Sequence, residues 1–226
     1  MVGGYVYVGM ALWSRPAKPL PRGTVLAEAR AGASGEVARL FEDIDRYCAE
    51  AGIRYYETGM VDYCIRGKHN WKTDANCENR CRYQTIKYYG LSGDFGDAMR
   101  GLDSALLTAG WTGRGSGLEW ILTDYCGPHY GPDKPKPTNF PRQYLVQNMP
   151  GASYTRGNFR LTIRAQEADS TGREFVLRFE DVMAMPHDLS HRNERVVATD
   201  SLVPVILASH RYMLVIGVMA DDYFVN

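Results

Sequence analysis

The densest group of side chains that could do chemistry lies midway along the chain, in the run from Asp124 through Cys126 and His129 to Tyr130. A cysteine thiolate is a nucleophile, and a nearby histidine can take its proton. The run follows an apolar segment and enters a proline-rich stretch, which is typical of a strand end where functional groups collect. No signature of a cysteine enzyme surrounds Cys126. Two interpretations stay open: a hydrolase or transferase with Cys126, His129 and Asp124 as catalytic residues, or a disulfide or buried thiol.

Two further patterns could hold a ligand. His187 and His191 are four residues apart and could bind a metal from one helix face, but Pro186 and the polar residues after them are typical of a solvated loop. The glycines of residues 113–117 precede an apolar strand, whereas a phosphate-binding loop follows one. The sequence therefore predicts no metal site and no cofactor.

Several of the fifteen tyrosines stand next to basic residues. On an exposed sheet face such residues could stack bases or form a protein-binding patch, since Tyr and Arg are enriched in interface hot spots. Lys+Arg and Asp+Glu both number 26, so the chain has no basic excess for nucleic acid. A protein-binding patch is therefore the preferred interpretation, and its candidate residues are Tyr55, Tyr56, Arg82, Tyr83 and Tyr88.

Composition places the chain among globular proteins. It has 226 residues, of which 45% are hydrophobic and 23% charged. These values exclude a disordered tail and a multi-span membrane protein. At about 150 residues per domain, the length predicts one large domain or two small ones.

The five cysteines indicate whether the protein works in an oxidising or a reducing compartment. Cys48 falls on the apolar face of a predicted helix and is expected to be buried and free. The disulfide candidates are Cys64, Cys77, Cys81 and Cys126; free thiols, or a zinc site built on the Cys77-x-x-x-Cys81 spacing, are the alternatives. A polar, turn-rich stretch separates Cys64 from Cys77, and disulfides commonly close such loops in exported proteins.

The first thirteen residues carry no charge and are mostly apolar. As a helix they would span about 20 Å, short of a hydrocarbon core of about 30 Å. They are either a strand or the end of a membrane helix that starts upstream of Met1, in which case a membrane anchor lies upstream of residue 14. A basic, proline-rich linker follows, and basic residues flanking a membrane helix favour the cytoplasmic side. This conflicts with the disulfide interpretation, and both compartments stay open.

Hydrophobic periodicity predicts the elements. In the first half we expect a helix capped by Ser34 and ended by Gly52, strands over 53–65 and 81–89, a helix over 95–109 capped by Ser92 or Asp94 and ended by Gly110, and a strand over 118–125. In the second half we expect a hairpin of 159–166 with 175–179, a polar connection over 185–194, a short helix capped by Asp200 or Ser201, and a strand over 212–219.

These elements predict an α+β fold, an antiparallel sheet with helices on one face. If the opening segment is a strand, the first half has the ferredoxin-like order βαββαβ, and the second half reads ββαβ. The expected divisions are an apolar segment and linker over 1–32, an α+β half over 33–126, a connection over 127–157 and a second half over 158–226. The two halves could form one continuous domain.

A faint family resemblance rests on a few short segments. They are the run from Tyr88 to Asp94, the pairs Leu102-Asp103 and Gly110-Trp111, and the run from His210 to Tyr212. In these the chain resembles small membrane-anchored or secreted actinobacterial proteins of unknown function. The resemblance implies an extracytoplasmic domain and brings no known activity or site.

The sequence as a whole favours a non-enzymatic, extracytoplasmic domain that binds a protein or cell-envelope component, with no nucleic-acid partner. A cytoplasmic location is the alternative. A small hydrolase or transferase using Cys126 and His129, and a small-ligand sensor domain, are the alternative functions.

Overall fold

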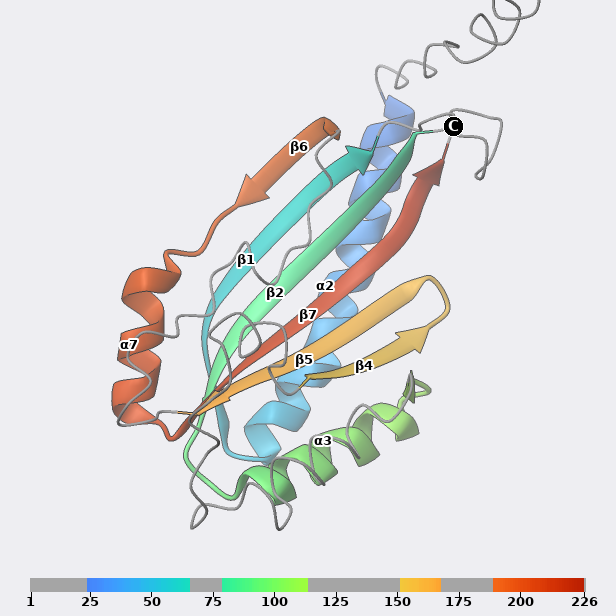
Figure 1. Ribbon diagram of the computed structural model, residues 1–226. Coiled ribbons are helices and arrows are strands. Elements are labelled where there is room, and N and C mark those ends of the chain that lie inside the picture. The colour runs from blue at the N-terminus through green and yellow to red at the C-terminus, as the bar shows by residue number, and fades with distance from the viewer. Residues whose placement is uncertain (1–23, 66–78, 114–150, 168–188, 226) are drawn as a thin grey trace, which may run out of the picture.

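The computed structural model describes residues 24–65, 79–113, 151–167 and 189–225. Its helices are α2 (Thr24–Glu50), α3 (Phe95–Thr108) and α7 (Thr199–Ser209), and its strands are β1 (Ile53–Ile65), β2 (Arg80–Leu91), β3 (Thr112–Gly113), β4 (Gly151–Arg156), β5 (Phe159–Glu167), β6 (Leu189–Arg195) and β7 (Tyr212–Val225). The strands form one antiparallel sheet in the order β3-β4-β5-β7-β2-β1-β6 (Figure 1). The predicted α+β class with an antiparallel sheet is confirmed.

Strand β7 joins the two halves of the chain. It pairs along its length with β2 on one side and with β5 on the other. The ferredoxin-like order is not confirmed, because the neighbours of the β1–β2 hairpin are β7, beside β2, and β6, beside β1, and neither comes from the N-terminal segment. The strands expected near residue 5 and over 118–125 lie outside the described residues.

The helices cover both faces of the sheet. Alternate residues of β7 point to opposite faces: Leu214, Ile216 and Val218 pack in the cluster with α2 and α3, whereas Met213 and Val215 pack in the cluster with α7. Figure 1 shows α2 passing behind the sheet, whereas Val203 and Ile206 of α7 pack against β2 and β7 from the opposite face. The expectation that the helices share one face is therefore wrong for α7. The near-continuous apolar run of β7 is typical of a strand covered on both sides.

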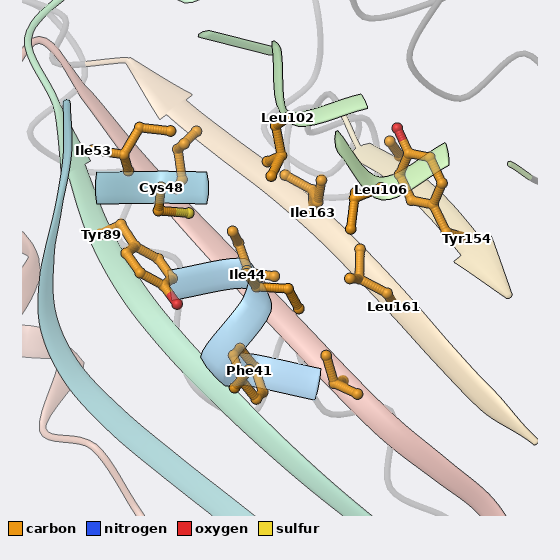
Figure 2. Close-up of a cluster of buried hydrophobic side chains, with 14 of the residues drawn as sticks. Phe41, Ile44, Cys48, Ile53, Tyr89, Leu102, Leu106, Tyr154, Leu161 and Ile163 are labelled. Carbon is orange, nitrogen blue, oxygen red and sulfur yellow. The ribbon is translucent and has the colours of Figure 1, made fainter. Parts of the chain in front are cut away.

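Helix α2 is longer than its amphipathic stretch predicts. Its buried residues are Ala33, Val37, Phe41, Ile44 and Cys48, and Figure 2 shows the last three facing the sheet. The predicted N-cap Ser34 is wrong, since the helix begins at Thr24 and the Ser34 hydroxyl donates a hydrogen bond to the Tyr83 hydroxyl oxygen. The predicted end is confirmed by Gly52, whose φ of +70° suits glycine.

The predicted ends of α3 are confirmed, whereas the predicted cap of α7 is wrong. Helix α3 starts after Asp94, whose carboxylate accepts the Asp97 N–H, and it is followed by Gly110 at a φ of +82°, as expected. Neither Asp200 nor Ser201 caps α7, because Ala198 is its N-cap.

One prediction for the second half is wrong, and another is tested only in part. The stretch expected to be a polar connection contains strand β6, which pairs with β1 along the edge of the sheet. The strand at 159–166 is confirmed as β5, but both of its edges are taken, by β4 and β7. The return strand predicted at 175–179 lies outside the described residues.

Cys48 is buried and free, as expected. Burial, and secondarily the Asp45 carboxylate, raise the pKa of its thiol to about 12. At neutral pH this sulfur is therefore a packed, protonated side chain and not a nucleophile.

Asp62 is a fully buried charge that ties three elements together. The Arg30 guanidinium of α2 forms an ion pair with its carboxylate, and the Tyr223 hydroxyl of β7 donates a hydrogen bond of 2.6 Å to Oδ1. A buried carboxylate is tolerated only when such partners replace its water. The contact fixes the N-terminal part of α2 over β1 and β7.

A disulfide joins Cys64 of β1 to Cys81 of β2, which face each other in the strand pairing. Of the four candidate cysteines, these two are therefore paired, and Cys77 and Cys126 lie outside the described residues. None of the described helices is both long and apolar enough to cross a membrane.

Replacing Cys64 and Cys81 together by alanine should lower the free energy of unfolding by about 3 kcal/mol. The reason is that the bond closes a loop with a sequence separation of 17 in the unfolded chain. Urea unfolding measures the change, and the reduced wild-type protein should match the variant. Equal stability of oxidised and reduced protein would contradict the bond.

The variant Asp62→Asn should lower the free energy of unfolding by about 3 kcal/mol, because Arg30 would lose its buried counter-charge. The control is Glu36→Gln, which breaks a pair with Arg39 whose side chains are 52% and 72% exposed; there the change should stay below about 1 kcal/mol. Similar losses in both variants would show that burial of Asp62 is not what matters.

Candidate functional site

The predicted catalytic residues Cys126, His129 and Asp124 lie outside the described residues. Their role stays a prediction. In the part of the chain that is described, no group of three His, Cys, Asp or Glu side chains is arranged to hold a metal ion.

The predicted Tyr/Arg binding residues do not meet on one exposed face. Tyr83 and Tyr88 are 8% and 0% exposed, because β2 lies between two strands and is covered on both sides. Arg82 forms an ion pair with Asp221, 3.2 Å away. Tyr55 is 47% exposed and packs edge-on against Tyr89. Tyr56 instead lies in a polar cluster with His210.

That cluster brings together Tyr56, Ser92 and His210. The Ser92 hydroxyl lies 2.7 Å from Nδ1 of His210, and the Tyr56 hydroxyl lies 2.8 Å from Nε2. The residues come from β1, from the connection between β2 and α3, and from the residue directly after α7. Sequence reasoning missed the cluster, because it considered Ser92 only as a helix cap and gave His210 no functional role. The segment from Gly90 to Asp94, a serine between a strand and a helix, was the available signal. His210, however, lies 118 positions from Ser92 and 154 positions from Tyr56 in the sequence.

Two local features of the sheet position the imidazole. The β1–β2 register shifts between Tyr55 and Glu57, which makes Tyr56 the extra residue of a bulge, and bulges re-aim side chains. Gly90 provides the space: a Cβ there would lie 2.3 Å from Cδ2 of His210. The ring therefore rests directly on the β2 backbone.

The surroundings of His210 favour its neutral form. Partial burial, and secondarily the positive charge of Arg54, lower the pKa of His210 below its usual 6.5. Arg54 lies over the Tyr56 ring, 5.2 Å from its centroid, and that ring meets the imidazole edge-on. A neutral imidazole has one donor and one acceptor nitrogen, and a hydroxyl on each side can satisfy either tautomer. At pH 7 the cluster therefore holds an unprotonated nitrogen next to a hydroxyl.

A second feature lies on the same side of the sheet. Helix α7 is apolar from Leu202 to Ala208, although only Val203 and Ile206 of this run are fully buried. Its solvent side carries Pro204, Val205 and Ala208, which we call the α7 outer face. Val205 is 56% exposed. A helix on a protein surface normally carries polar residues there.

The comparisons with known proteins return nothing to guide the assignment: no family model matches the chain, and no curated protein or solved structure matches it either.

Replacing Gly90 by alanine should displace the His210 ring, because the new Cβ would overlap it. The ring would then lose its hydrogen bonds and part of its burial, and its pKa should rise from below 6.5 toward 6.5. An NMR titration of the His210 ring protons measures this.

The matched control is Gly101→Ala, where a Cβ meets nothing within 4 Å. It should leave the His210 titration unchanged. The same His210 pKa in wild type and Gly90→Ala would contradict the packing of the ring on Gly90.

Proposed function

We propose that this chain is an extracytoplasmic domain that binds a protein partner through the α7 outer face. The observation that carries the proposal is the outward-facing run of apolar residues on α7. Exposed apolar residues that gather on one element favour an interaction surface more than scattered ones do.

The charge around this surface suits a polar rim. Val196, 52% exposed, comes shortly before the helix in the sequence, and Arg192 and Arg195 are exposed on the edge strand β6, which precedes the helix. Arg192 is paired with Glu194, and Arg195 with Glu57. An apolar centre with paired charges at its margin is the usual composition of a protein interface.

The proposed compartment is supported by the disulfide. Disulfides persist mainly in oxidising compartments such as the cell exterior. The Cys64–Cys81 bond fits a location outside the cytoplasm.

The variant Val205→Glu should reduce partner binding at least tenfold, which corresponds to a loss of about 1.4 kcal/mol for a residue at the centre of an interface. The fold should be unaffected, since Val205 is exposed and Glu is a good helix former. The measurement is affinity capture from a cell-envelope extract, followed by native mass spectrometry of the purified pair.

The matched control is Leu107→Glu, a 51% exposed apolar residue on α3, across the sheet from α7. It should bind the partner as wild type does. Equal capture by both variants, or no captured partner at all, would refute the proposal.

A further inference from the structure

We propose that Ser92 is a nucleophile with His210 as its general base, and that this site cleaves uncharged carboxylic esters of small acyl groups. This goes beyond the binding function and departs from the non-enzymatic expectation. It does not depend on the α7 outer face.

The geometry meets the basic requirements of nucleophilic catalysis. A nucleophile needs a base within hydrogen-bond reach, and the base needs a third group that orients it. Ser92 is exposed and lies 2.7 Å from Nδ1 of His210, and the Tyr56 hydroxyl holds Nε2 from the other side. Tyr56 is thus a positioning residue. Gly90 has no Cβ, so the His210 ring can pack directly on the backbone of β2.

The backbone around Ser92 has the strand–turn–helix order of a nucleophile elbow. Strand β2 ends at Leu91 and α3 begins at Phe95, so the serine stands on a strand-to-helix turn. The residues Gly90 to Asp94 depart from the G-x-S-x-G pattern at the last position, where aspartate replaces glycine.

The same turn offers a donor for a developing oxyanion. In an elbow, the backbone N–H after the nucleophile is one of these donors, and here it belongs to Gly93. No partner for the Gly93 N–H is seen in the described part of the chain.

The surrounding charges select the substrate. Asp94, the N-cap of α3, lies two residues after Ser92 and disfavours an anionic substrate such as a phosphate ester, whereas the charge of Asp97 is paired with Arg100. Gly93 beside Ser92 has no side chain to block the approach of a carbonyl group, and a Cβ there would meet only Leu91, at 3.8 Å. An uncharged ester with a small acyl group fits both features.

The reaction balances with water as the only co-reactant. Ser92 Oγ attacks the carbonyl carbon and passes its proton to Nδ1 of His210, while Nε2–H donates to Tyr56. The C–O bond to the alcohol breaks, and the alcohol oxygen takes the proton from Nδ1, leaving an acyl ester on Ser92. Water then attacks this ester and gives its proton to Nδ1, which returns it to Ser92 Oγ as the carboxylic acid leaves.

The test is labelling with an uncharged fluorophosphonate, followed by peptide mapping, together with hydrolysis of p-nitrophenyl acetate. Wild type should carry one adduct, at Ser92. Ser92→Ala should abolish it, and His210→Gln should slow labelling about 100-fold. The control is Ser104→Ala, which removes an exposed serine of α3 and should label as wild type does.

The labelling rate should rise with pH and level off above a midpoint below 6.5, since the base acts when His210 is neutral. The groups that face its ring are Arg54 and Tyr56 from β1 and Ser92 from the β2–α3 turn. His210→Gln should lose this midpoint, which a merely structural histidine would not cause. Tyr56→Phe keeps the ring, removes the hydroxyl, and should slow labelling about tenfold.

An adduct that forms at Ser92 equally fast in wild type and His210→Gln, or no adduct at Ser92, would overturn the proposal. Circular dichroism confirms that each variant is folded, and Tyr56→Phe with an unchanged rate would overturn the positioning role. Val205→Glu should label normally, so the failure of the binding function and the failure of this site give different results.

Discussion

The pairing of β7 with β2 and β5 is the constraint on which the rest of the structure depends. It brings the last strand of the chain between a strand of the first half and a strand of the second. Successive side chains of β7 point to opposite faces of the sheet, and most of them are apolar. The strand therefore supplies part of both hydrophobic clusters. The α2–α3 layer and the α7 layer therefore share one central strand. The paired strands are far apart in the sequence. The chain must therefore lose the entropy of closing long loops before the contacts of β7 can stabilise the fold.

Polar contacts fix α2 on this sheet. At one end of the helix, Asp62 is held by Arg30 and the Tyr223 hydroxyl. Further along, Asp45 accepts from the Tyr89 hydroxyl at 2.7 Å and lies 2.5 Å from the Lys87 ammonium. Apolar packing alone would allow the helix to slide along the sheet, whereas hydrogen-bonded charges accept few positions. We infer that these two contacts set the register of α2 more than they add to stability, since burying charge offsets much of its attraction.

The Tyr56–Ser92–His210 cluster follows from the same arrangement. The chain leaves α7 at His210 in an extended conformation and enters β7 two residues later. Because β7 lies beside β2, this exit passes directly over Gly90 and next to Ser92. The bulge in β1 then turns Tyr56 toward the other nitrogen of the ring. The α7 outer face lies on the same helix, so both candidate functions belong to one region of the molecule.

Local physics was enough to predict most of the elements. The spacing of Val37, Phe41 and Ile44 predicted α2, the apolar runs predicted β1, β2, β5 and β7, and Asp94 and Gly110 marked the ends of α3, because periodicity and capping act within a few residues. The tertiary structure decided what depends on distant partners. The polar edge strand β6 forms only because β1 has a free edge, α7 lies on the second face because β7 is apolar on both sides, and Ser34 is helical because α2 continues past it over the sheet. The contact of His210 with Ser92, 118 positions away, exists only once β7 has paired with β2, since a hydrogen bond between distant residues has no local signature.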